Sequence, residues 1–150
     1  KDFLKSTYSF MAKERSIVSV FDGDEAGIRA VKELGSYFGN KDIQFNPNQE
    51  YILLPGRAPI EALFPHSWLL ELSNHNPKLM RIERDAFGAM VSIDMPGNNK
   101  MEICNWLINR SIDATKEANG VYEWAKDFIA IFNILDQTLA QKHQNITREN

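Results

Sequence analysis

Two aspartates spaced two residues apart, Asp22 and Asp24, are the side chains of this sequence best suited to chemistry. They follow the apolar, β-branched run 16–21, and Gly23 stands between them. Side chains two apart in extended backbone point the same way, so both carboxylates can face one site. Neighbouring carboxylates repel each other unless a cation lies between them, and Mg²⁺ accepts one or two carboxylates with water completing its shell. The sequence therefore predicts a divalent metal site at this pair.

A parallel strand–helix–strand–helix unit is the arrangement that would position these aspartates. The run 16–21 is typical of a strand buried on both faces, and apolar spacing predicts a helix over residues 25–38. A second strand is expected at 51–54, followed by a helical segment from Pro59. Gly27 is expected to let the first helix pack closely against the sheet. Ligands of open α/β sheets lie at the carboxyl ends of strands, which is where the aspartates stand.

The second half of the chain has a different pattern. Residues 77–93 are mixed and are expected to be partly helical, whereas 101–108 and 121–144 have the apolar spacing of helices. The fold class predicted is therefore α/β, with a parallel sheet in residues 1–73 and a mainly helical part over 74–150.

Two other interpretations compete for the aspartate pair. Aspartate is among the best helix N-cap residues, so the pair can serve only to begin a helix. An EF-hand calcium loop also begins Asp-x-Asp, and Gly27 and Glu33 meet its sixth and twelfth positions. Against the EF-hand, Ala26 offers no ligand at the fifth position, and Arg29 replaces the usual apolar residue at the eighth. A strand-like run, moreover, precedes the loop.

Residues 20–27, Val-Phe-Asp-Gly-Asp-Glu-Ala-Gly, resemble the Asp-x-Asp motif of TOPRIM domains. Such domains occur in topoisomerases, bacterial primases, recombination-mediator proteins and the overcoming-lysogenisation-defect (OLD) nucleases. Residues 53–63, Leu-Leu-Pro-Gly-Arg-Ala-Pro-Ile-Glu-Ala-Leu, are most similar to the OLD nucleases, where a Leu-Pro-Gly turn, a basic residue and a Pro-x-Glu step follow the aspartates. The resemblance covers about residues 15–64. It implies the C-terminal portion of a TOPRIM domain within 1–73, and a metal-dependent DNA endonuclease.

The resemblance also implies roles for individual residues. Asp22 and Asp24 are expected to bind Mg²⁺ or Mn²⁺, with Glu61 completing the shell of a second ion. Arg57, where family members often have Lys, is expected to clamp the scissile phosphate. For Glu61 the alternative is an acid that complements a helix dipole, and for Arg57 an exposed turn residue. Glu25 follows the turn and is expected to be solvated.

TOPRIM domains place a catalytic Glu on a strand that precedes the aspartates. Fifteen residues precede Ser16 here, with Glu14 among them, which is too few for that strand and its helix. Because the first residue is Lys rather than Met, the chain is expected to be part of a longer protein, with an ATPase domain upstream. The isolated chain is then expected to be weakly active or inactive. Primase-type or topoisomerase-type TOPRIM proteins and a non-catalytic α/β binding module are the alternatives.

Composition limits the partners and the location. DNA is the expected substrate, but a net charge of −3 adds no general attraction for its phosphates. DNA must therefore be bound through metal, a local basic patch or another part of the molecule. No apolar run approaches the ~20 residues that span a bilayer. Residues 1–5 lack the apolar core of a signal peptide, so no secretion signal is expected. The single cysteine, Cys104, excludes an internal disulfide, so a cytoplasmic location is expected. A homodimer is compatible with the sequence.

The remaining reactive and aromatic residues are expected to be structural. His66, His75 and His143 are scattered and lack the helical spacing of a zinc pair. The apolar stripe from Trp124 to Leu139 recurs at helical spacing, which favours a core face over a base-stacking platform.

Overall fold

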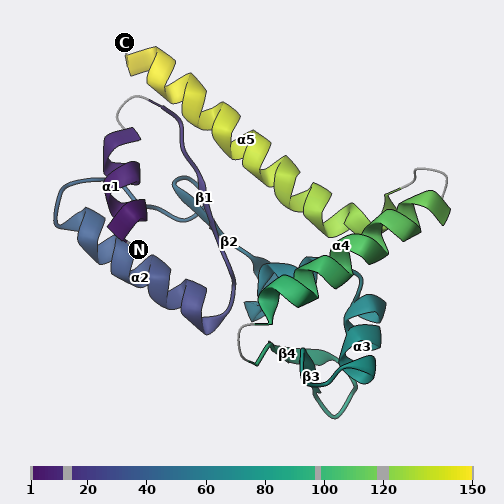
Figure 1. Ribbon diagram of the computed structural model, residues 1–150. Coiled ribbons are helices and arrows are strands. Elements are labelled where there is room, and N and C mark those ends of the chain that lie inside the picture. The colour runs from purple at the N-terminus through teal and green to yellow at the C-terminus, as the bar shows by residue number, and fades with distance from the viewer. Residues whose placement is uncertain (1, 12–14, 97–98, 118–121, 150) are drawn as a thin grey trace. The chain divides into compact units, whose positions relative to one another are not determined.

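The computed structural model describes residues 2–11, 15–96, 99–117 and 122–149 (Figure 1). Its elements, in chain order, are α1 (Asp2–Met11), β1 (Ser19–Phe21), α2 (Glu25–Gly39), β2 (Tyr51–Leu53), η1 (Pro55–Arg57), η2 (Ile60–Leu63), α3 (His66–His75), β3 (Arg81–Arg84), β4 (Met90–Asp94), α4 (Lys100–Glu117), η3 (Glu123–Ala125) and α5 (Lys126–Glu149). The fold is mixed α/β, as predicted at that level. No helix of the described ranges is long and apolar enough to cross a membrane.

The chain divides into two compact units. The first consists of Lys1–Arg57 and Ile131–Asn150, and the second of Ala58–Ala130. Helix α5 therefore starts in the second unit and ends in the first. The predicted division after residue 73 concerns where a TOPRIM portion would end. It stays a prediction, because the two compact units do not identify such a portion.

The parallel strand pair of the first unit confirms the predicted strand–helix–strand order. Strands β1 and β2 pair in parallel, and α2 connects them (Figure 1). The register places Ser19 opposite Tyr51, Val20 opposite Ile52, and Phe21 opposite Leu53. The strand is shorter than the apolar run that predicted it, since β1 begins at Ser19. Because a strand precedes Asp22, the EF-hand interpretation, which requires a helix there, is not supported.

The apolar face of α2 supplies the core of the first unit. Leu34 and Phe38 lie one helical turn apart and are both buried, together with Tyr8 from α1. The Phe38 ring is 4.8 Å from the Tyr8 ring and 5.0 Å from the Phe45 ring, measured between centroids. The predicted stripe on this helix is thus the face that packs, and this packing fixes α2 beside the strands.

A buried ion pair holds the C-terminal part of α5 within the first unit. The Nζ of Lys142 lies 3.0 Å from the Oε1 of Glu50, and it also donates to the carbonyl oxygen of Ile17 at 2.9 Å. The Oε2 of Glu50 accepts the backbone N–H of Asn46 at 2.9 Å. Glu50 is only 4% exposed. Burial raises the pKa of the Tyr8 phenol well above its usual range, and the negative charge of Glu50 adds to this shift.

The prediction of partial helix over residues 77–93 is wrong, because β3 and β4 form an antiparallel hairpin there. The Oδ1 of Asp85 accepts the N–H groups of Phe87 and Ala89, both at 2.9 Å, and Gly88 has a φ of +81°. A side chain that caps a turn and a glycine at positive φ are both typical of β-hairpin loops. Phe87 is 97% exposed at this turn.

The rest of the second unit follows the sequence more closely. The helical segment expected from Pro59 consists of the 3₁₀ turn η2, which follows Pro59, and the helix α3, which follows Pro65. Helix α4 extends beyond the predicted range 101–108. The prediction ended too early because the residues that follow include few apolar side chains. The buried core of this unit consists of Leu69, Leu72, Leu79, Met80, Ile103 and Leu107.

Candidate functional site

The aspartate pair lies at the carboxyl end of β1. Asp22 directly follows the strand, and Asp24 is the N-cap of α2, with φ −72° and ψ 176°. The Oδ1 of Asp24 accepts the backbone N–H of Gly27 at 2.8 Å. Both aspartates are half-buried, and Gly23 between them is buried. The capping interpretation is therefore correct for one oxygen of Asp24, while a carboxylate has further lone pairs with which to accept other partners.

Gly27 locks the first turn of α2 against the backbone of Asp22. A Cβ atom at this position would lie 1.9 Å from the carbonyl oxygen of Asp22 and 2.8 Å from its carbonyl carbon. No side chain fits at such distances, so only glycine permits this approach. The close packing predicted for Gly27 is confirmed. The contact fixes the backbone of Asp22 relative to the helix whose cap is Asp24.

The capping bond of Asp24 gives a stability prediction that separates its structural role from its charge. Asp24→Ala removes the acceptor for the Gly27 N–H and is expected to destabilise the protein by about 1 kcal/mol. Asp24→Asn keeps an acceptor of similar capping strength and is expected to cost only a few tenths of a kcal/mol. Urea denaturation of both variants measures the difference. Equal losses in the two would show that the cap contributes nothing.

Glu61 is a buried carboxylate in η2 of the second unit. It is 4% exposed, and within the described part of the chain its Oε2 has no hydrogen-bond partner. Burying an unpaired carboxylate oxygen is costly, so such an atom is a candidate for a ligand. Glu61 is also the acid in the first turn of η2, so both the ligand role and the dipole role stay predictions. Because the aspartates belong to the first unit, a metal site that includes all three stays a prediction.

The Leu-Pro-Gly segment forms the expected turn. Gly56 has a φ of +80° inside η1, a conformation that L residues rarely adopt. Arg57 closes this turn at the end of the first unit, and its role toward a phosphate stays a prediction. Glu14, the acid noted ahead of the strand, lies outside the described residues.

The described ranges contain no group of three or more His, Cys, Asp or Glu side chains placed to hold a metal ion. Two aspartates alone are compatible with Mg²⁺, which commonly keeps several waters and takes its remaining ligands from substrate phosphate. The metal therefore stays a prediction that the donor set allows. The histidines form no cluster, and His75 Nδ1 lies 2.8 Å from the carbonyl oxygen of Glu71 on its own helix.

An aromatic cavity in the second unit was missed by sequence reasoning. Trp124, assigned to a core face, is half-buried and lines this cavity together with Phe64 and Trp68. The segments that meet there are far apart in the chain, and no motif joins them. Only their packing reveals the site.

No family model matches the chain, and comparisons with curated proteins and with solved structures found no significant match. The TOPRIM resemblance therefore rests on the motif residues, and the functional argument rests on the geometry of this site.

Proposed function

We propose that this chain carries the aspartate portion of a TOPRIM-type site for metal-dependent phosphodiester hydrolysis, most similar to that of the OLD DNA endonucleases. The observation that supports the proposal is the placement of Asp22 and Asp24 where a parallel strand ends and a helix begins. The Gly27 contact and the Asp24 cap hold this junction rigidly. DNA is the proposed substrate, and an ATPase domain of the same protein is the proposed partner, in a cytoplasmic protein.

In this proposal Asp22 and Asp24 hold Mg²⁺ or Mn²⁺. Ions in such sites activate the attacking water and stabilise the leaving oxygen of the phosphodiester. The N-terminus of α2 adds a favourable potential for phosphate at the same junction. Glu61, whose Oε2 is buried without a hydrogen bond from the described residues, is proposed as a further ligand, and Arg57 as a cation for the scissile phosphate.

The second candidate is a non-catalytic α/β binding module in which the aspartates serve the fold. The capping bond of Asp24 favours it, since that bond needs no metal. A TOPRIM domain of primase or topoisomerase type remains the alternative within the first class. The two classes differ in one measurable property, which is divalent metal affinity at the pair.

Calorimetric titration with Mn²⁺ tests the proposal. The chain is expected to bind Mn²⁺ weakly, because two carboxylates make an incomplete shell. Asp22→Asn and Asp24→Asn remove charge with little change of shape, and each is expected to weaken binding at least about tenfold, since even outer-shell changes cost 10–100-fold. Asp136→Asn, an exposed aspartate of α5, is the control and should bind like the unmodified chain. Equal heats from all four proteins would exclude the metal site.

Nicking of supercoiled plasmid in Mn²⁺ tests the catalytic part of the proposal. Slow nicking or none is expected from the chain itself, because few ligands hold the ions and the net charge of −3 adds little affinity for DNA. Any nicking should disappear in Asp22→Asn and in EDTA. Nicking that persists in the variant would contradict the assignment of Asp22.

A further inference from the structure

The second unit contains an open cavity of about 740 Å³, and neither Asp22 nor Asp24 is among its lining residues. Two segments form it, one where η2 leads into α3 and one where η3 leads into α5. Its lining residues are Ala62, Phe64, Pro65, His66, Trp68, Glu123, Trp124, Lys126 and Asp127. The cavity is large enough for a drug-sized or nucleotide-sized molecule, since ligand pockets commonly span about 300–1,000 Å³.

Two aromatic rings of the cavity, those of Phe64 and Trp124, lie almost parallel, and the ring of Trp68 is tilted against both. The planes of Phe64 and Trp124 differ by 8°, with centroids 5.9 Å apart. Trp68 is inclined by 30° to Phe64 and by 31° to Trp124. A cage for a rounded organic cation needs ring faces that surround it from several directions. A near-parallel stack instead presents a flat face, which suits a flat, aromatic ligand.

Hydrogen bonding fixes the orientation of the Trp124 ring. The indole Nε1–H of Trp124 donates to the Oγ1 of Thr115 on α4 at 3.0 Å. A ring whose polar edge is already bonded offers its face rather than its N–H to a ligand. Since Trp124 is only half-buried, part of the ring borders the open cavity.

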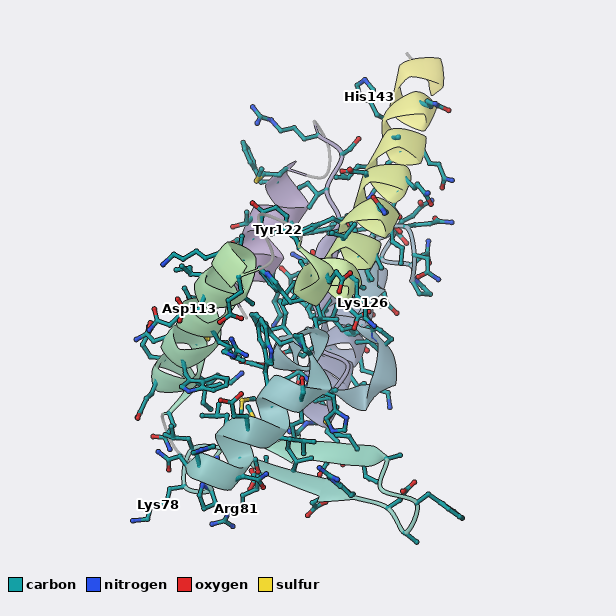
Figure 2. All side chains as sticks on the ribbon, turned by 90° about the vertical axis from the view of Figure 1, so that its right-hand side faces the viewer. Lys78, Arg81, Asp113, Tyr122, Lys126 and His143 are labelled. Carbon is teal, nitrogen blue, oxygen red and sulfur yellow. The ribbon has the colours of Figure 1, made fainter. Side chains whose placement is uncertain are left out.

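Charged groups of both signs surround this aromatic wall. Lys126, at the first residue of α5 (Figure 2), and His66, at the first residue of α3, are exposed and can approach an anion. Glu123 and Asp127 are exposed carboxylates that also line the cavity, and carboxylates accept hydrogen bonds from amino groups. A ligand that combines a flat ring, an amino group and a phosphate satisfies all of these groups.

We propose that this cavity binds an unpaired nucleotide of a single-stranded nucleic acid, with the base against Trp124 and its phosphate near Lys126. The carboxylates favour bases that carry an exocyclic amino group, so cytosine and adenine are preferred to thymine. This inference deepens the proposed function by naming a strand-binding site outside the aspartate pair. A duplex hides its base faces and therefore binds more weakly.

Fluorescence anisotropy of a labelled oligocytidine strand measures the binding in EDTA, so that no metal contributes. Trp124→Leu is expected to weaken the strand at least about fivefold, the loss that removal of one stacking side chain causes. Lys126→Glu is expected to weaken it as well and to reduce the salt dependence by about one phosphate contact. The oligothymidine strand and the duplex should bind less tightly than oligocytidine.

The matched control is Lys78→Glu, the same charge change at an exposed lysine of the same unit that Figure 2 shows well away from Lys126. It should leave the affinity within about twofold of the unmodified chain, because surface charges beyond a Debye length are screened. If Trp124→Leu fails to fold, Lys126→Glu decides the question, since Lys126 is exposed.

The outcomes separate this inference from the metal site. Strand binding in EDTA tests this cavity, whereas Mn²⁺ titration and nicking test the aspartate pair, so either proposal can fail without the other. Equal affinities for the unmodified chain, Lys126→Glu and Lys78→Glu would overturn the proposal. Displacement of the strand by choline, but not by cytidine monophosphate, would overturn it in favour of an organic-cation site.

Discussion

Gly27→Ala is expected to destabilise the protein by about 3 kcal/mol, a large fraction of the roughly 5–15 kcal/mol that stabilises a typical domain. The added methyl group would lie 1.9 Å from the Asp22 carbonyl oxygen, far inside contact distance. The obstacle is backbone, so no side-chain rotation relieves it, and α2 must move away from the end of β1. Urea denaturation followed by circular dichroism measures the loss.

Gly35→Ala on the same helix is the matched control. Nothing lies within 4 Å of a Cβ atom at Gly35, which is in the interior of α2. Alanine there is expected to stabilise the protein by up to about 1 kcal/mol, because it lowers the entropy of the unfolded chain and favours the helix. Opposite signs for two identical substitutions on one helix identify the close approach as the cause. A loss of less than about 0.5 kcal/mol in Gly27→Ala would contradict the packing described for this junction.

Lys142→Met is expected to cost about 3 kcal/mol of unfolding free energy. The substitution keeps most of the apolar stem but removes the ammonium group that lies 3.0 Å from Glu50 and donates to the Ile17 carbonyl. Glu50 then remains a buried charge without its cation. Leaving a charge buried and unpaired costs far more than losing an exposed ion pair. Denaturant titration at neutral pH measures the change.

Two further variants isolate that mechanism. Glu50→Gln combined with Lys142→Met removes both charges and is expected to recover more than half of the loss, since no buried charge remains. Lys116→Met breaks an exposed pair with Asp113, whose atoms are 3.8 Å apart, and is expected to change stability by less than about 0.5 kcal/mol. If the double variant is no more stable than Lys142→Met alone, the buried charge of Glu50 is not the source of the cost.

Elements with local signals could be predicted from the amino-acid sequence alone. The apolar run before Asp22 and the helical spacing after Glu25 predicted β1, α2 and their parallel return to β2, because side-chain periodicity reports backbone conformation directly. The Asp-Gly-Asp segment placed the candidate pair at the end of the strand for the same reason. The role of Gly27 also followed, since a glycine in a first helical turn indicates close approach.

Features that depend on contacts between distant segments could not be predicted in this way. Residues 77–93 have a mixed apolar pattern, and the antiparallel pairing of β3 with β4 determined their conformation. The pairing of Glu50 with Lys142, the unpaired oxygen of Glu61 and the aromatic cavity have no local signature. Each of these features depends on which polar groups or rings are buried, and by which distant parts of the chain. Burial is set by the folded structure, so no local pattern in the sequence reports it.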